Sequence, residues 1–244
     1  MAEELAAVTI LNVPVHPLTM AKTVAVLDEK IAGKRQTFVV TANAEILMMA
    51  DKDRAYQNII AETADIVLPD GAGVVWAGRH LGYQMPERVA GYDLFLHLLA
   101  LSAEKGYKVF FFGGTPGIAE IAAKISQEKN KGLKIAGCLN GYFTDEDNEK
   151  ILKTINDSDA DILFAALGAP KQEKWLAKWR SQLKPSLLMG IGGSFDVVAG
   201  KTKRAPLWMQ QASLEWLYRL IKQPSRLGRM TALPKFVLKV LFKR

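Results

Sequence analysis

The sequence predicts an α/β fold with a mainly parallel sheet, and two observations carry that prediction. Strand-like runs alternate with helix-like runs along most of the 244 residues, as in chains built from repeated strand–helix units. Several strand-like runs are apolar on both faces, among them VFFF, ILFAAL and SLLMGI, which is typical of strands covered by helices on both sides. An apolar fraction of 49% suits a globular protein with a sizeable core.

Each expected strand is a short apolar run bounded by polar or turn-forming residues, and the stretches between the strands are expected to be helical. The strands are expected at residues 8–13, 38–41, 65–68, 108–112, 134–137, 161–167 and 186–191. The helices are expected at residues 17–32, 44–63, 73–81, 92–105, 118–128, 145–156 and 172–183. The expected fold class is therefore α/β, with a Rossmann-like, mainly parallel sheet flanked by helices and a basic helical appendage at the C-terminus.

The appendage is marked by a change of composition at residues 201–206, KTKRAP. We expect an α/β domain of residues 1–204 and a helical appendage of residues 205–244. Residues 1–204 hold 24 Lys and Arg against 24 Asp and Glu, whereas residues 205–244 hold eight basic residues and one acid, Glu215. The net charge of +7 therefore lies in the appendage, which predicts contact with phosphate, nucleic acid or an acidic membrane surface.

The end of the appendage has the pattern of a basic amphipathic helix. Lys235, Lys239 and Lys243 recur every four residues among apolar ones, so a helix would place its lysines in one stripe beside a broad apolar face. Such a helix can lie in a membrane interface. It can equally pack on the body of the protein or on a partner subunit.

Several protein classes are excluded or disfavoured. Cys138 is the only cysteine, which excludes an internal disulfide framework and favours a reducing compartment. The N-terminal MAEELAAVTI carries acids where an export signal needs bases, and no apolar run reaches the roughly 20 residues of a membrane span. The fingerprints G-x-G-x-x-G and G-x-x-x-x-G-K-[ST] are missing, which disfavours nicotinamide enzymes and P-loop proteins.

Metal ligation is also disfavoured, although literal D-x-D strings occur. They are Asp51-Lys-Asp53, Asp145-Glu-Asp147, Asp157-Ser-Asp159 and Asp159-Ala-Asp161. We expect the first on a solvated helix surface, the second in a first helical turn and the last two at the amino end of a strand. The three histidines lie in no metal-binding spacing. We therefore expect no metal ion and no cofactor.

Polar residues and glycines follow the expected strands, at the edge of a parallel sheet where ligands gather. These residues are Thr41, Asn43, Asp70, Gly113, Gly114, Tyr142, Gly168, Gln172, Gly192, Gly193 and Asp196. One such junction alone is ordinary turn chemistry, but several on one edge favour a ligand site. Gly113 and Gly114 open the string GGTPG ahead of a helix, where free backbone N–H groups can bind a nucleotide phosphate.

Asp70 is the second aspartate of the run DIVLPDG, and it lies where the expected buried strand ends. It can be a solvated turn residue, a cap for the next helix or a catalytic base. Thr41 and Asn43 end a neighbouring strand at the same edge. The presence of Thr41 and Asn43 there favours the interpretation of Asp70 as a catalytic base.

Six motifs, DIVLPDGAGVVWAGR, TANAE, RVAGYDL, FFFGG, NGYF and GAPKQE, together resemble the TagA/WecG/CpsF family of bacterial glycosyltransferases over essentially the whole chain. The resemblance implies an inverting, metal-independent transfer of N-acetylmannosamine from UDP-N-acetylmannosamine to the 4-hydroxyl of GlcNAc on undecaprenyl diphosphate, in wall teichoic acid synthesis. The same fold with another UDP-sugar donor, N-acetylmannosaminuronic acid or glucose, is the alternative. Asn43 follows Ala42 where the family often has a proline.

The resemblance also implies roles for single residues. Asp70 matches the general base, Thr41, Asn43 and Gln172 match pocket residues, and Arg88 matches a basic residue near the acceptor or the developing diphosphate charge. Tyr142, Gly192, Gly193 and Asp196 lie in stretches assigned to the nucleotide. The arginines of the appendage that are expected to close over the site at the membrane are Arg219, Arg226 and Arg229.

The partners implied are a UDP-sugar donor, a lipid-diphosphate-linked GlcNAc acceptor and an anionic membrane surface bound through the appendage. We expect a cytoplasmic protein, peripheral on the inner face of the cell membrane, with a homo-oligomer possible and no nucleic acid bound. A non-enzymatic nucleic-acid binder is the distant alternative, and it predicts steeply salt-dependent binding through the basic tail.

Overall fold

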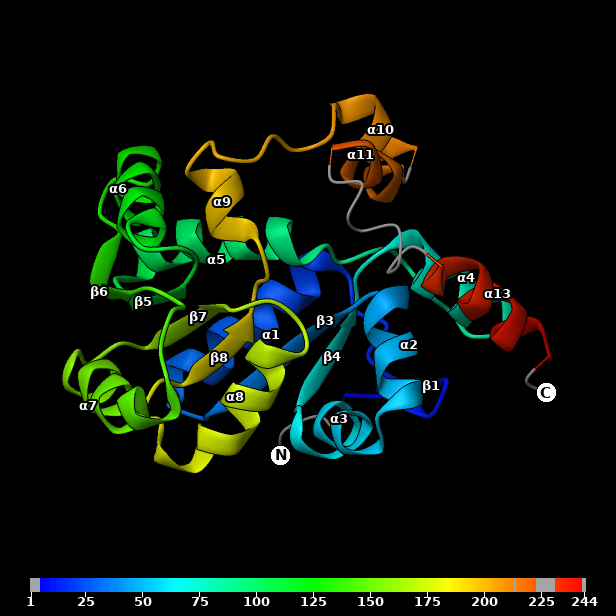
Figure 1. Ribbon diagram of the computed structural model, residues 1–244, viewed down its shortest axis with the longest axis horizontal. Helices are drawn as coiled ribbons and strands as arrows, with labels where there is room; N and C mark the ends of the chain where they lie inside the picture. The colour runs from blue at the N-terminus through cyan, green and yellow to red at the C-terminus, as the bar shows by residue number, and fades with distance from the viewer. Residues whose placement is uncertain (1–4, 213, 223–230, 243–244) are drawn as a thin grey trace.

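The computed structural model describes residues 5–212, 214–222 and 231–242. Its centre is a six-stranded sheet with the order β4-β3-β8-β7-β5-β6, and all its strand pairs are parallel (Figure 1). The strands are β3 (Thr37–Ala42), β4 (Ile66–Pro69), β5 (Lys108–Gly113), β6 (Lys134–Leu139), β7 (Ile162–Ala166) and β8 (Leu187–Gly190). The predicted fold class is confirmed.

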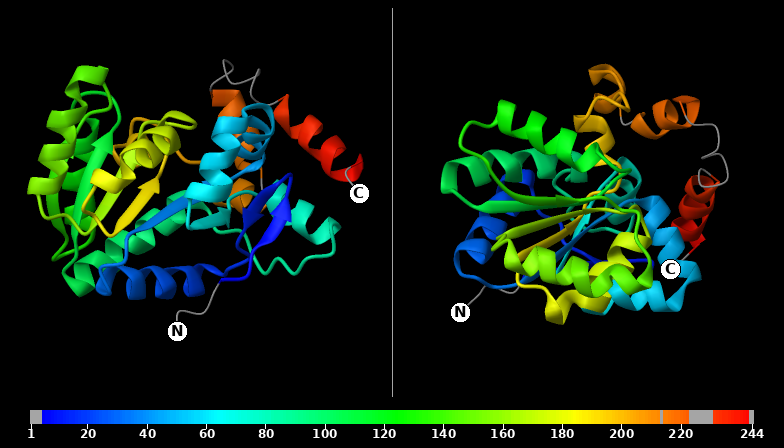
Figure 2. Two further views of the ribbon diagram at one scale, coloured as in Figure 1. Left: turned by 90° about the horizontal axis from the view of Figure 1, so that it is seen from below. Right: turned by 60° about the vertical axis from the view of Figure 1, so that its left-hand side comes forward.

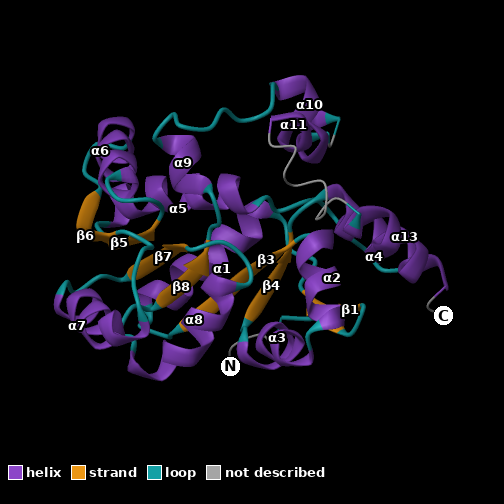
Figure 3. Ribbon diagram, viewed as in Figure 1, coloured by secondary structure: helices purple, strands orange, loops and turns teal. Residues whose placement is uncertain are grey.

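Helices cover both faces of the sheet, as Figure 3 shows. One face packs against α1 (Met20–Ala32), α5 (Gly91–Lys105), α6 (Ile118–Lys129) and α9 (Ser194–Val198). The other packs against α2 (Ala44–Lys52), α3 (Arg54–Asn58), α4 (Ala72–His80), α7 (Asn148–Asp157) and α8 (Lys171–Trp179). The strands β3, β4, β7 and β8 are apolar on both sides because both faces are buried.

Two expected elements are wrong in detail. The strand expected at residues 8–13 is an antiparallel hairpin of β1 (Val8–Ile10) and β2 (Val13–Val15), because Leu11 and Asn12 adopt φ values of 48° and 65° and reverse the chain. The helix expected at residues 44–63 breaks at Asp53, whose Oδ1 accepts from the backbone N–H of Tyr56 at 3.1 Å and caps α3. A π-helical turn, Ile59–Thr63, completes that stretch.

The C-terminal part is helical, as predicted. Figure 1 shows an extended segment leading from α9 to α10 (Leu207–Gln211) and α11 (Glu215–Lys222). The last helix, α13 (Ala232–Phe242), lies beside α2 in both views of Figure 2 and also contacts α4. Within the described part of the chain, no helix is both long and apolar enough to cross a membrane. The division into two domains at residue 204 stays a prediction.

Candidate active site

A cavity of about 250 Å³ opens at the carboxyl ends of β3, β4 and β8. It is called the site cavity below. β3 and β8 are neighbours in the sheet although they lie far apart in the sequence, so the residues that follow them meet at one edge. The predicted residues that line the cavity are Thr41, Asn43, Asp70, Gly168, Gln172, Gly192, Gly193 and Asp196.

Asp70 follows the last residue of β4 and lines the site cavity with a partly buried side chain. Its backbone N–H donates to the carbonyl oxygen of Ala42 at 2.9 Å, which ties it to the end of the neighbouring strand. The cap position of α4 belongs to Gly71, with φ of 110°, rather than to Asp70. Asp70 therefore does not occupy the cap position of α4, and it lines the site cavity.

Thr41 and Asn43 come to the cavity from the end of β3. A Cβ atom on Gly91, the first residue of α5, would lie 2.6 Å from the Thr41 Oγ1 atom, so only glycine allows this close approach. Asn43 caps α2 with its Oδ1 atom, which accepts from the backbone N–H of Ile46 at 3.0 Å. That cap uses the oxygen of the carboxamide, so the NH₂ group is the donor that Asn43 can offer to a substrate.

Gln172 is buried and held at both ends of its carboxamide. Its Nε2 atom donates to the Glu173 carboxylate at 2.7 Å, and its Oε1 atom accepts from the backbone N–H of Gly192 at 2.9 Å. Glu173 is itself buried and accepts from the Tyr56 hydroxyl at 3.1 Å. Burial raises the pKa of the Glu173 carboxyl. Gln172 therefore fixes the glycine loop after β8, as well as lining the cavity.

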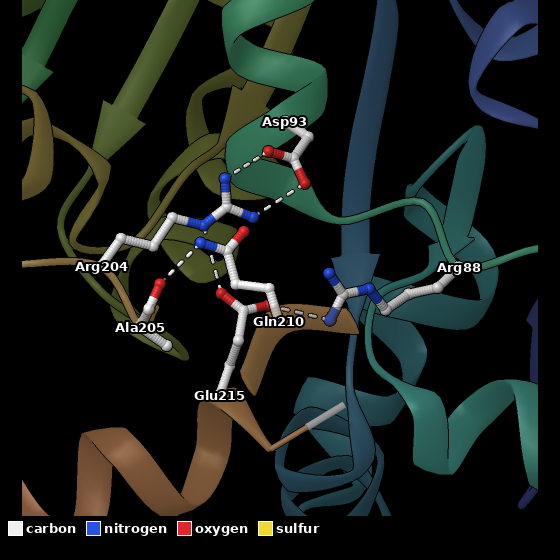
Figure 4. Close-up of polar contacts among 6 residues, drawn as sticks. All are labelled: Arg88, Asp93, Arg204, Ala205, Gln210 and Glu215. Carbon is white, nitrogen blue, oxygen red and sulfur yellow. Dashed lines mark hydrogen bonds and ion pairs between the residues drawn. The ribbon is translucent and has the colours of Figure 1, made fainter. Parts of the chain in front are cut away.

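Arg88 lies outside the site cavity and lines a neighbouring groove. Its Nη1 atom donates to Glu215 Oε2 at 2.9 Å, and Glu215 Oε1 accepts from Arg204 Nε at 3.2 Å (Figure 4). Arg204 also donates from both of its Nη atoms to the carboxylate of Asp93, at 2.6 and 2.9 Å. These four side chains, called the arginine network below, are two cations and two anions at the edge of the site.

Sequence reasoning missed Arg204, which also lines the site cavity. Its guanidinium stacks over the ring of Tyr92, 4.9 Å from the ring centroid. Lys203 and Lys222 line the same cavity, so with Arg204 it offers three cations to a phosphate group, beside the carboxylates of Glu45, Asp70 and Asp196. The basic run KTKR is the sequence signal for Arg204, but its change of composition predicts only a domain boundary.

Other predicted residues lie away from the site cavity. Gly113 packs so closely that a Cβ there would lie 2.4 Å from the Ala166 carbonyl oxygen, and Gly114 donates its N–H to that oxygen at 3.0 Å. These two glycines therefore join β5 to β7. Tyr142 is 71% exposed after β6. Arg219 lies on α11, where its side chain is not described, and Arg226 and Arg229 lie outside the described residues.

The D-x-D strings have structural partners. Asp51 was expected in solvent, but its side chain is only 16% exposed and pairs with Lys239 of α13. Asp53 caps α3, and Asp147 accepts from the backbone N–H of Thr144 at 2.8 Å in a first helical turn. Asp161 lies at the amino end of β7, as predicted. Among the residues that the structure describes, no three His, Cys, Asp or Glu side chains are grouped to hold a metal ion.

Comparison with known proteins places this sequence in one family. Residues 8–244 match the model of the glycosyl transferase WecG/TagA/CpsF family. An N-acetylglucosaminyldiphosphoundecaprenol N-acetyl-beta-D-mannosaminyltransferase of Bacillus subtilis strain 168 is 37% identical over 235 residues, covering 96% of this chain and 90% of the relative. A Bacillus spizizenii protein of the same name is 40% identical over 206 residues, with 84% and 78% covered. One of Staphylococcus aureus strain MW2 is 33% identical over 237 residues, with 96% and 92% covered.

Proposed function

The chain belongs to the WecG/TagA/CpsF family of glycosyl transferases, and from this premise we propose that it transfers N-acetylmannosamine from UDP-N-acetylmannosamine to the 4-hydroxyl of GlcNAc-diphospho-undecaprenol. The product is the linkage unit of wall teichoic acid. The observation that carries the proposal is the meeting of Asp70, Thr41, Asn43 and Gln172 in one cavity that cations also line. The names of the three relatives support the choice of donor sugar and acceptor.

Asp70 is the general base in this proposal. Its carboxylate takes the proton from the acceptor hydroxyl as the hydroxyl oxygen attacks the anomeric carbon from the face opposite UDP. The bond from that carbon to the UDP oxygen breaks with inversion, and UDP leaves with the bonding electrons. A weakly basic carboxylate can serve because the hydroxyl becomes acidic only as the new bond forms.

The departing UDP places negative charge on its diphosphate, and cations of this chain stabilise that charge. Lys203, Arg204 and Lys222 line the site cavity, and Arg88 lies next to it. Guanidinium groups bind phosphate oxygens through paired hydrogen bonds. We therefore propose metal-independent transfer, in which arginine and lysine do the work of a metal ion.

We further propose that the protein works at the inner face of the cell membrane, where its lipid-linked acceptor lies. α13 packs on the body through Phe236 and Val240 but exposes Val237, Leu238, Leu241 and Phe242. The described part of α13 also exposes Lys235 and Lys239. An exposed apolar face with lysines beside it suits the interface of an anionic bilayer.

The test is the release of UDP from a panel of UDP-sugars, with a GlcNAc-diphospho-lipid acceptor in detergent, with and without EDTA. We expect acceptor-dependent turnover with UDP-N-acetylmannosamine that EDTA leaves unchanged. Asp70→Asn should lower kcat about 100-fold to about 10,000-fold, the usual contribution of a general base. The matched control Asp145→Asn makes the same change at an exposed turn and should leave kcat within about twofold of the unmodified value.

Each other outcome has a defined meaning. Turnover with a different UDP-sugar alone would replace the donor and keep the family. Inhibition by EDTA would refute metal independence. Full activity of Asp70→Asn would mean that Asp70 is an ordinary turn residue and not the general base.

A further inference from the structure

A second cavity, called the α4 groove below, adjoins Arg88 and differs in character from the site cavity. Its volume is about 560 Å³. Its lining consists of Ala72, Val75, Trp76, Arg79, His80, Glu87 and Arg88. One face of α4 therefore supplies an apolar and aromatic surface, and charged groups stand around it.

Hydrogen bonds fix the wall of the groove. Arg79 donates from Nε and Nη2 to the carbonyl oxygen of Met85, at 3.0 and 2.8 Å, and so holds the loop after α4 against the helix. The carboxylate of Glu87 accepts from the backbone N–H of Met20 in α1. These two charged side chains are thus used to build the groove. Arg88 and His80 are the other cationic or ionisable groups of the groove, and Arg88 is paired with Glu215.

Trp76 is the largest apolar group of the groove. Its side chain lies on α4 with 36% of the residue exposed, and its ring stacks on that of His80 with the ring centroids 5.4 Å apart. A flat ring held in this way offers a broad apolar contact surface whose position is already fixed. This surface can hold a hydrocarbon chain by apolar contact.

The α4 groove and the site cavity are lined by neighbouring residues at the junction of β4 with α4. Asp70 lines the site cavity, and Ala72, two residues later, lines the groove. The backbone N–H of Val89 donates to the Pro69 carbonyl oxygen at 2.9 Å, which holds Arg88 beside the same strand end. The groove therefore begins beside the strand end that carries Asp70.

We propose that the α4 groove binds the first isoprenoid units of the lipid acceptor, with the hydrocarbon chain on Trp76 and the diphosphate at Arg88. The inference rests on the proposed function, since that acceptor joins a sugar, a diphosphate and a polyisoprenoid in this order. The sugar lies near Asp70, and a diphosphate oxygen takes the place of the Glu215 carboxylate on Arg88. Because α13 packs against α4, its exposed apolar face lies at the end of the molecule where the chain leaves.

Binding of farnesyl diphosphate, a soluble isoprenoid diphosphate without a sugar, tests the groove apart from any transfer reaction. Isothermal titration calorimetry should show saturable binding to the unmodified chain that is tighter than binding of inorganic diphosphate. Trp76→Ala should weaken farnesyl diphosphate about tenfold, because a large apolar contact is lost, and should leave inorganic diphosphate unchanged. The control Ile121→Ala removes an exposed apolar side chain from α6 and should change neither affinity.

Transfer to two acceptors separates this inference from the proposed function. Both carry GlcNAc diphosphate, one with a polyisoprenyl tail and one with a short alkyl tail. Trp76→Ala should raise KM for the polyisoprenyl acceptor about tenfold and leave kcat and the short-tail KM unchanged. If neither acceptor is used by the unmodified chain, the proposed function fails and the calorimetry still decides the groove.

Three results would overturn the groove as an isoprenoid site. They are equal binding of farnesyl diphosphate and inorganic diphosphate, equal KM changes for both acceptors, and loss of binding to anionic vesicles in Trp76→Ala while farnesyl diphosphate still binds. The last result would assign Trp76 to the bilayer surface.

Discussion

The two helical pieces of the C-terminal part join the body in opposite ways. α13 inserts Phe236 and Val240, which are 1% and 2% exposed, into the core formed with α2 and α4. α10 and α11 bury Met209 but leave Leu207 74% and Ile221 65% exposed. They meet the body at the arginine network, where Glu215 joins Arg88 and Arg204 (Figure 4).

The difference shows which piece belongs to the scaffold and which can respond to substrate. Buried apolar contacts have no competitor in solution, whereas an ion pair can be exchanged for a phosphate anion. α13 is therefore part of the same core as α2 and α4. α10 and α11 are docked through the ion pairs of Glu215, at the edge of the site cavity.

The largest effect on stability is expected at Phe236. Phe236→Ala should lower the free energy of unfolding by about 3–5 kcal/mol, because it removes a fully buried aromatic ring. Urea denaturation followed by tryptophan fluorescence measures this loss. Phe242→Ala on the same helix removes a ring that is 83% exposed and should change the free energy of unfolding by less than about 0.5 kcal/mol. Equal losses would mean that α13 is not part of the core.

Glu173, a buried carboxyl inside the α/β body, extends the comparison to the pH dependence of stability. Burial raises the pKa of the Glu173 carboxyl above the ordinary value of 4.5. The stability that this carboxyl contributes is therefore full below pH 4.5 and is lost as pH rises through the raised pKa. Relative to Glu173→Gln, the unmodified chain should lose free energy of unfolding over the pH range above 4.5, until the raised pKa has been passed.

Denaturation of both proteins across this pH range measures the difference between their free energies of unfolding. The control is Glu146→Gln, which changes an exposed glutamate in the turn before α7. Its free energy of unfolding should differ from that of the unmodified chain by the same amount at every pH. For Glu173→Gln, a difference that moves in the opposite direction would mean that Glu173 is held ionised by the donors from Gln172 and Tyr56.

The smallest effect on stability is expected at Glu215. Glu215→Gln weakens two partly exposed ion pairs, so the free energy of unfolding should fall by about 1 kcal/mol or less. The amides of α11 should nevertheless exchange with deuterium faster, and added salt should have the same effect on the unmodified chain. Glu104→Gln on α5 is the control, and unchanged exchange in α11 would show that charge does not dock this helix.

Much of the fold and the centre of the site could be predicted because they follow from local pattern and one topological rule. The doubly apolar runs gave the parallel strands, and the rule that ligands lie at carboxyl ends brought Thr41, Asn43, Asp70 and Gln172 together. The β1–β2 hairpin was missed because Leu11 and Asn12 turn the chain without the glycine that usually marks such a turn. The break at Asp53 was missed because apolar residues continue at helical spacing on both sides.

The remaining site features depend on partners far away in the sequence. Arg88 meets Glu215 and Arg204 meets Asp93 only once the chain has folded, so no spacing in the sequence marks these pairs. Gln172 was expected as a pocket residue, but its hydrogen bonds to Glu173 and Gly192 required the register of α8 against β8. Charge counts found the basic tail but could not show which of its residues turn inward.

The position of β8 has a consequence for how the protein is made. β8 fills the place between β3 and β7, although it is the last strand of the sheet to leave the ribosome. A nascent chain that ends after β7 can form only two partial sheets, β4–β3 and β7–β5–β6, whose open edges expose unpaired backbone groups. The glycine loop of the site arrives with β8 as well. The sheet and the site are therefore completed only when β8 and the glycine loop after it join the two partial sheets.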